Sequence, residues 1–218
     1  MRARAAFALA LILSSGPVSA AADDPPAAQE NWATARARAL TEQGLAHRNA
    51  GAVDQAIARF NEAIAIDATY GPAYLALASL REGRGERDEA LKVLEMAMER
   101  DPSFDAAIES RGDVLARAGR FGEATTAYLE LLTRHPNEVA LLEKILETAP
   151  KGNLMPVALA ASRRLALVAR EAGDAAREKR ARTFTRALER LVSEADPVRR
   201  GAASSDRVRR ALSRTWSR

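Results

Sequence analysis

Residues 85–104 read GERDEALKVLEMAMERDPSF, and the chain repeats this stretch in altered form on both sides. Thirty-four residues earlier, at Gly51, begins GAVDQAIARFNEAIAIDATY, and thirty-four residues later, at Gly119, begins GRFGEATTAYLELLTRHPNE. Apolar residues recur within each copy at spacings of three and four, which places them on one face of a helix. A fixed period of this length predicts an architecture that repeats one supersecondary unit.

The period divides the middle of the chain into three units, 37–70, 71–104 and 105–138. Each unit is interpreted as two short helices separated by a glycine that permits positive φ, at Gly51, Gly85 and Gly119. Small residues recur where the two helices would cross: Gly44, Ala78 and Gly112 in the first helices, and Ala56, Ala90 and Ala124 in the second. Helix axes approach within about 8–10 Å where such side chains are small. The pattern therefore predicts closely packed helix hairpins.

These residues resemble the tetratricopeptide repeat (TPR) family, in which a 34-residue period carries small, glycine, alanine, aromatic and proline positions. Pro102 and Pro136 stand at the unit junctions, as the family pattern requires, but Ala68 replaces the first of these prolines. Gln43 and Arg111 also replace a usual leucine. The resemblance implies an all-α fold, an α-solenoid of stacked antiparallel helix hairpins whose concave face is lined by the first helix of each unit.

The two ends of the repeat array depart from the pattern. A backward extension of the first helix gives a repeat region of 31–138, in which Trp32 is expected to cover the exposed start of the core. Residues 139–149 look like the first helix of a fourth unit, after which PKGNLMP is expected to break the register. Two long helices, Val157 to Ala172 and Asp174 to Glu194, are expected to complete a degenerate, capping region over 139–196.

Residues 1–20, MRARAAFALALILSSGPVSA, have the three-part layout of a secretory signal peptide. Arg2 and Arg4 precede a short apolar run, and small residues end at Ala20, where a signal peptidase would cut. An uncleaved anchor or an ordinary buried helix is the alternative. We expect an exported protein, periplasmic or secreted and typical of a bacterial envelope, with a disordered lead over 21–30.

Composition excludes several kinds of chemistry. The chain has no cysteine, which rules out disulfides and thiolate metal sites. No phosphate-binding loop, nucleophile elbow or zinc-protease motif is found in the sequence. His47 is interpreted as a packed core residue, and His135 as a side chain facing terminal helix carbonyls. We therefore expect no catalytic residues, no metal, no cofactor and no small-molecule substrate.

The resemblance to the TPR family assigns a candidate partner-binding groove to the first helices. Its residues are Arg38, Thr41, Leu45, Arg48, Asn49, Leu75, Ser79, Glu82, Glu109, Asp113, Ala116 and Arg117. The lysines and asparagines with which one subfamily grips a chaperone carboxylate are missing from these positions. Leu45 and Leu75 would hold an apolar side chain, and the three acids would favour a basic neighbour. The alternative is that all of these are merely exposed helix residues.

Charge divides the chain in two: residues 21–150 carry a net charge of −8 and residues 151–218 a net charge of +10. After a linker at 197–206, residues 207–218 form a candidate basic amphipathic helix. Its candidate anionic-surface residues are Arg207, Arg209, Arg210, Arg214, Trp216 and Arg218. Three interpretations stay open: docking on the repeats, a frayed tail, and an anionic membrane surface. Nucleic acid is not expected, because a secretory signal would carry the chain away from it.

The sequence thus predicts a non-enzymatic, exported scaffold or adaptor that binds a protein or peptide in a groove built from repeats. The alternative function is a peripheral envelope protein held to anionic lipid or polymer by its basic C-terminal helix. The identity of the partner is not encoded in any of these features.

Overall fold

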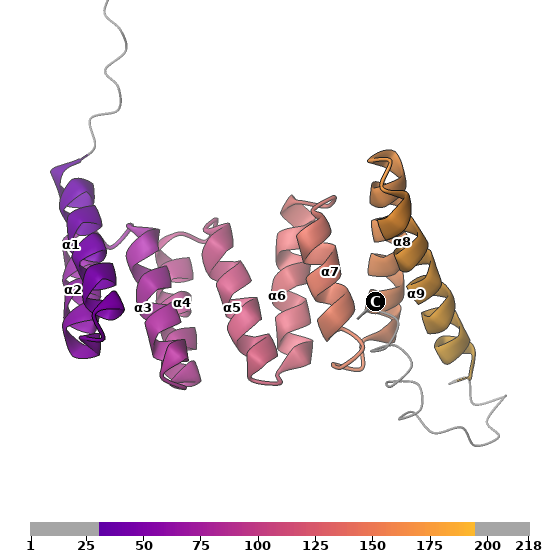
Figure 1. Ribbon diagram of the computed structural model, residues 1–218, viewed down its shortest axis with the longest axis horizontal. Coiled ribbons are helices and arrows are strands. Elements are labelled where there is room, and N and C mark those ends of the chain that lie inside the picture. Colours follow the sequence, from indigo (N-terminus) through magenta and orange to yellow (C-terminus); the bar gives the residue numbers. More distant parts are fainter. Residues whose placement is uncertain (1–30, 195–218) are drawn as a thin grey trace, which may run out of the picture. The chain divides into compact units, whose positions relative to one another are not determined.

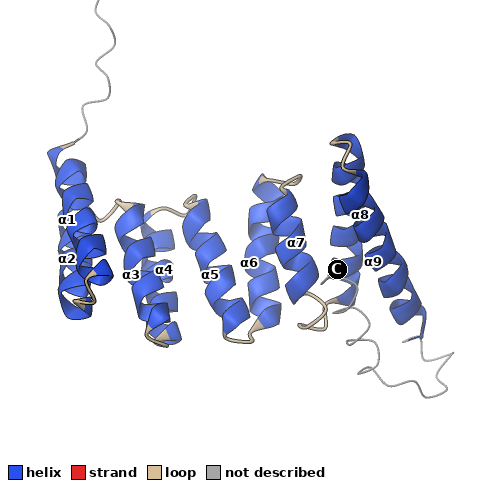
Figure 2. Ribbon diagram, in the orientation of Figure 1, coloured by secondary structure: helices blue, strands red, loops and turns tan. Residues whose placement is uncertain are grey.

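A computed structural model describes residues 31–194, which form helices and connecting loops with no strand among them (Figure 2). The helices belong to one compact unit that begins at Trp32. They are α1 (Trp32–Asn49), α2 (Val53–Ile66), α3 (Gly71–Gly83), α4 (Arg87–Arg100), α5 (Asp105–Arg117), α6 (Phe121–Arg134), α7 (Val139–Thr148), α8 (Met155–Glu171) and α9 (Ala175–Glu194). The predicted fold class, an all-α solenoid of stacked hairpins, is confirmed.

The first six helices form three hairpins, α1/α2, α3/α4 and α5/α6, and each hairpin packs on the next (Figure 1). The turn inside each hairpin places a glycine in the left-handed region, with φ of +77° at Gly51, +81° at Gly85 and +77° at Gly119. The next N–H then reaches back to the preceding helix, as in the 2.9 Å bond from Ala52 to the His47 carbonyl. Glycine suits this turn because it has no Cβ to clash.

Small residues in the first helices make room for large ones in the second. A Cβ added to Gly44 would lie 2.4 Å from the Phe60 ring, and one added to Gly112 would lie 2.5 Å from the Tyr128 ring. Both rings are buried. At the matching positions the α3/α4 hairpin carries the intermediate pair Ala78 and Leu94, which are also buried. The predicted role of small residues at the helix crossings is confirmed.

The repeat register continues beyond α6, so the predicted break at PKGNLMP is wrong. Asn153, thirty-four residues after Gly119, has a φ of +60° and is the one non-glycine with positive φ within residues 31–194. The N–H of Leu154 bonds to the Ala149 carbonyl at 2.8 Å, which reproduces the bond of the earlier turns. Asparagine replaces glycine here because its short polar side chain tolerates the left-handed region. Helix α8 therefore begins thirty-four residues after α6.

The C-terminal end of the described region is a pair of long helices. α8 packs on α7 and, more extensively, on α9, to which it is joined by a turn with Gly173 at a φ of +72°. The buried core between them contains Leu165, Phe184 and Leu188. The Thr185 hydroxyl donates a 2.9 Å hydrogen bond to the hydroxyl of Ser162, which satisfies a fully buried polar group.

Trp32 does not cover the start of the core, which corrects the prediction for this residue. Its side chain is 75% exposed, whereas Ala37 and Leu40 are fully buried and fill this end of the core. The physical reason is position: Trp32 opens α1, and helical side chains tilt toward the N-terminus, so its ring extends past the core.

No helix within residues 31–194 is both long enough and apolar enough to cross a membrane. The predicted signal peptide at 1–20, the lead at 21–30, the linker at 197–206 and the basic helix at 207–218 lie outside the described residues.

Candidate functional site

The candidate groove residues come from three helices that lie side by side. α1 packs on α3, and α3 packs on α5, so their outward side chains form one continuous surface, called here the first-helix face. It comprises the groove residues predicted from the sequence, from Arg38 to Asn49 on α1, Leu75 to Glu82 on α3, and Glu109 to Arg117 on α5. Within each helix they stand three and four residues apart, as one helical face requires.

Most of these side chains are available at the surface. Arg38, Arg48, Asn49, Ser79 and Arg117 are exposed. Leu45, Leu75, Glu82, Glu109, Asp113 and Ala116 are partly buried. Thr41 is the exception, because it is only 5% exposed and its hydroxyl donates a 2.8 Å bond to the Ala37 carbonyl. Thr41 is therefore a core residue, and the first-helix face consists of the other predicted groove residues.

A lysine that the sequence reasoning missed stands between two of the predicted acids. Nζ of Lys144 on α7 lies 2.7 Å from Oε1 of Glu109 and 2.6 Å from Oδ1 of Asp113 on α5. The Tyr128 hydroxyl donates a 2.7 Å hydrogen bond to the same Asp113 oxygen. Nζ also lies 5.4 Å from the centre of the Tyr128 ring, within the range of a cation–π contact.

This arrangement fixes the charge states of the cluster. Partial burial works against the charged form of Lys144, but hydrogen bonds to Asp113 and Glu109 outweigh it, so the pKa of the ammonium group is raised. Burial, reinforced by the bond to Asp113, raises the pKa of the Tyr128 hydroxyl far above its ordinary value. The lysine is thus charged and the tyrosine neutral at any physiological pH.

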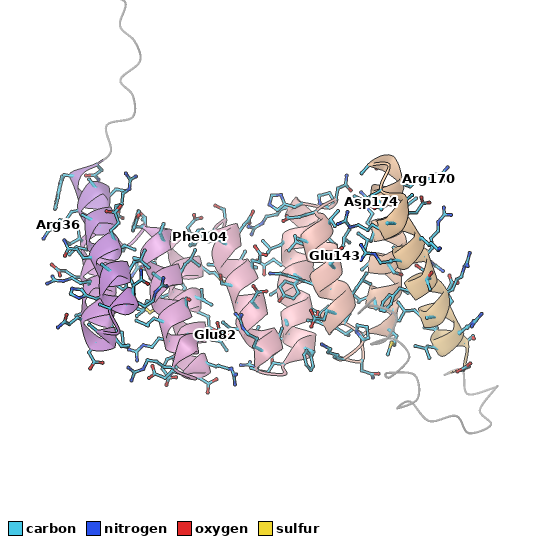
Figure 3. All side chains as sticks on the ribbon, in the orientation of Figure 1. Arg36, Glu82, Phe104, Glu143, Arg170 and Asp174 are labelled. Carbon is cyan, nitrogen blue, oxygen red and sulfur yellow. The ribbon has the colours of Figure 1, made fainter. Side chains whose placement is uncertain are left out.

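Comparable pairs recur along the solenoid. The guanidinium of Arg117 on α5 pairs with Glu82 on α3, and Arg177 on α9 lies 3.2 Å from Glu143 on α7. Figure 3 labels Glu82 and Glu143 on their helices. Each of these pairs joins an acid to a base about one repeat later in the chain. We call this set, including the Lys144 cluster, the ion-pair ladder: Glu82–Arg117, Glu109 and Asp113–Lys144, and Glu143–Arg177.

The ladder corrects one expectation from the sequence. Glu82, Glu109 and Asp113 were expected to favour a basic neighbour from a partner, but the chain supplies their counter-charges itself. The paired side chains retain between 17% and 58% of their exposure, and such pairs are worth about 0.2–1 kcal/mol each. The ladder therefore orients neighbouring helices and offsets most of the acidic charge of the face, whereas its contribution to the stability of the fold is small. Arg117, Lys144 and Arg177 lie 34 or 35 residues after Glu82, Glu109 and Glu143, so a search one period further along the chain, with one residue of tolerance, would have found them.

The two histidines hold structural positions. His47 is only partly buried rather than packed fully in the core. His135 Nε2 lies 2.5 Å from Oδ2 of Asp105, and Arg134 pairs with the same carboxylate, so the end of α6 is tied to the start of α5. Both contacts lower the pKa of the Asp105 carboxyl group, and the hydrogen bond with His135 contributes most. Within residues 31–194 no group of three or more His, Cys, Asp or Glu side chains is placed to hold a metal ion.

Helix hairpins at a 34-residue period, with their first helices on one shared face, define a repeat protein of the α-solenoid class. The family model described as a tetratricopeptide repeat-like domain matches residues 28–149, more than half of the chain. The chain therefore belongs to the tetratricopeptide repeat-like family, as the resemblance in its sequence predicted.

Solved structures share the fold at low sequence identity. A crystal structure of MamA is 19% identical, with coverage of 64% of this chain and 76% of that chain and a TM-score of 0.55. MamA from Desulfovibrio magneticus is 12% identical, with coverage of 74% and 97% and a TM-score of 0.52. PilF of Pseudomonas aeruginosa is 19% identical, with coverage of 86% and 90% and a TM-score of 0.52. The search of curated proteins found no match.

Proposed function

We propose that this chain is a non-enzymatic, exported scaffold or adaptor that binds a protein or peptide partner through the first-helix face. Membership of the TPR-like family supports the general role, because these folds serve as protein-interaction scaffolds. Export to the periplasm or beyond the cell rests on the layout of residues 1–20.

The observation that carries the proposal is the contiguity of the first-helix face. Ser79 is exposed on α3, between α1 and α5, and Leu45 and Leu75 offer partly buried apolar surface beside it. Contacts between successive first helices, helped by the ion-pair ladder, hold this surface in place before a partner arrives. Preorganisation of this kind raises affinity because less freedom is lost on binding. Since the acids are already paired, we expect the partner to be held mainly by apolar and neutral polar contacts.

Site-specific photo-cross-linking tests the assignment. A photoreactive amino acid is placed at Ser79 on the first-helix face or at Ala65, an exposed residue of α2, and the full chain is expressed in its native host. We expect a discrete cross-linked protein from position 79 that is missing at position 65. Equal products at both positions, or none at position 79, would exclude the first-helix face as the main binding surface.

A second candidate function rests on the C-terminal residues. Five arginines and a tryptophan within 207–218 follow amphipathic helical spacing, which favours attachment to an anionic lipid or polymer surface. The test is co-sedimentation of the full chain with anionic vesicles at low and physiological salt. Neutralising Arg207, Arg209 and Arg210 with glutamine should abolish the association, and unchanged co-sedimentation would exclude this role.

A further inference from the structure

A cleft of about 440 Å³ runs along the outer side of the α8/α9 hairpin. Its walls are two matching stripes: residues 163, 166, 167 and 170 of α8, and residues 182, 185, 186 and 189 of α9. Each stripe follows the i, i+3, i+4, i+7 spacing of a single helical face. Both stripes lie opposite the side chains that form the hairpin's core, such as Leu165 and Leu188.

Four arginines line this cleft, and two of them have no counter-charge in the part of the chain that the structure describes. Arg163 lies 2.8 Å from Glu189 at one end of the cleft, and Arg182 lies 2.8 Å from Glu178 on its own helix. Neither Arg170 nor Arg186 takes part in an ion pair within residues 31–194. Because α8 and α9 are antiparallel, Arg170 lies near the α8–α9 turn, where Figure 3 labels it, whereas Arg186 lies toward the other end, one helical turn from Glu189. The two arginines that have no ion pair within residues 31–194 therefore stand toward opposite ends of the cleft.

The floor of the cleft is apolar. Ala166 and Leu167 line it, and Leu167 is 51% exposed, one of the few large apolar side chains so exposed in the described region. Each earlier hairpin is covered by the helix that follows it, as α5 covers α3 and α4. Within residues 31–194 no helix follows α9 to cover this hairpin in the same way. The cleft is thus an apolar strip with charged edges, which no helix within residues 31–194 covers.

We propose that this cleft binds an acidic amphipathic helix of a partner protein. The stripes span about 10 Å along each helix axis, which matches two turns of a bound helix. Apolar side chains of that helix would cover Leu167, and its carboxylates would pair with Arg170 and Arg186. Guanidinium groups bind carboxylates in a bidentate manner, so arginine favours carboxylate ligands over neutral ones.

Charge argues against the chain's own tail as the occupant. The tail begins directly after α9, so it has the length to reach the cleft, but residues 207–218 carry five arginines and no acid. Like charges in contact oppose docking. An anionic membrane offers the same sign of charge, so vesicles are one arm of the test, but the two stripes flank a shallow groove that a helix would fill along its length. A partner helix satisfies both the shape and the charge.

This surface is separate from the first-helix face, so the two proposals fail independently. The probe is a synthetic amphipathic helical peptide of about 18 residues with leucines on one face and glutamates flanking them. Its binding to the full chain is followed by fluorescence anisotropy. The test variant is R170E/R186E, and the matched control is R36E/R87E, which changes the net charge equally at two exposed arginines of α1 and α4 that have no ion pair within residues 31–194.

We expect R170E/R186E to weaken peptide binding by about tenfold or more, because two attractive charges become repulsive, while the control stays within about twofold. Raising salt from about 50 to 300 mM should weaken binding to the unaltered chain severalfold. The milder variant R170Q/R186Q should give an intermediate loss and guards against misfolding, which circular dichroism checks for every variant.

Three outcomes would overturn the proposal. The first is equal binding by the test and control variants. The second is equally tight binding of a peptide with the same composition but scrambled order, which would show charge attraction without a helix site. The third is loss of anionic-vesicle binding in R170E/R186E without any peptide binding by the unaltered chain, which would assign the cleft to a membrane surface.

Discussion

Asn153 repeats the backbone conformation of Gly119 thirty-four residues later, with φ of +60° against +77°. This relationship extends the repeat through α7 and α8, past the end of the family match at residue 149. Alanine at the matching position of the second helix, Ala158, is fully buried like Ala124 before it. In sequence register, α7 and α8 are therefore a fourth unit and α9 stands at the place of a fifth first helix, although α8 packs more extensively on α9 than on α7.

Asn153→Gly should stabilise the protein, because a non-glycine residue in the left-handed region costs about 1 kcal/mol. Asn153→Val should destabilise it by about 1–2 kcal/mol, since a β-branched residue is least tolerant of positive φ. Urea unfolding at equilibrium measures both. A Val variant as stable as the Gly variant would show that this turn does not constrain the fourth unit.

Gly44→Ala should destabilise the first hairpin by about 1–3 kcal/mol, because its Cβ would lie 2.4 Å from Phe60. Phe60→Leu alone should also destabilise it, by leaving a cavity. The two substitutions together reproduce the Ala78 and Leu94 combination of the second hairpin. The double variant should therefore lose about 1 kcal/mol less free energy of unfolding than the sum of the losses in the two single variants. The control is Gly83→Ala, which meets nothing within 4 Å and should be neutral or stabilising. Strict additivity of the two substitutions would contradict the complementarity of these positions.

Lys144→Met should destabilise the protein by about 1 kcal/mol, because it leaves Glu109 and Asp113 side by side without a shared cation. Lys92→Met, at an exposed site of α4, should change stability little. Thermal unfolding of the two variants gives the comparison. High salt should reduce the difference in stability between the Lys144→Met and Lys92→Met variants. A stability difference that grows with salt would rule out an electrostatic origin.

Asp67 should make the first unit sensitive to acid. Hydrogen bonds from the Thr69 hydroxyl and then from Thr34 on α1 lower the pKa of Asp67 below its ordinary value of 3.8. Because the pKa of Asp67 is lower in the folded state than in the unfolded state, its carboxylate stabilises the fold at pH values above the unfolded-state pKa. This stabilisation is lost as the pH falls through the folded-state pKa. The stability difference between the unaltered chain and Asp67→Asn should therefore shrink as pH falls below about 4. Thr34→Ala should weaken this pH dependence, and a difference that is constant with pH would exclude the mechanism.

Much of the fold followed from residues whose type is dictated by backbone or packing. Gly51, Gly85 and Gly119 mark positive φ, and the alanines of the second helices mark close crossings, so the hairpins could be derived without coordinates. The positive φ of Asn153 could not be predicted, because the prolines and the glycine around it suggest a break in the repeat register. Trp32 was misplaced because hydrophobicity indicates a preference for burial but not the direction in which a terminal side chain extends.

The binding face was harder to derive, since it depends on contacts between units. Thr41 has the right spacing for the face but its neighbours enclose it. Glu109 and Asp113 have the exposure expected of binding residues, yet Lys144 from the next unit pairs with both of them. The cleft on α8/α9 could not be predicted either, because it forms only where the stripes of two different helices face one another. Whether a charged side chain on one helix is available to a partner depends on the side chains of the neighbouring helices, which the sequence alone does not place.

The central claim is that the first-helix face binds a protein partner, and affinity for the protein cross-linked at position 79 tests it most directly. The full chain is compared with Ser79→Arg and with Ala65→Arg, which adds the same charge on α2. We predict a loss of about tenfold or more for Ser79→Arg, less than about twofold for Ala65→Arg, and little dependence on salt because the acids of the face are paired within the chain. Equal affinity of the two variants would contradict the claim.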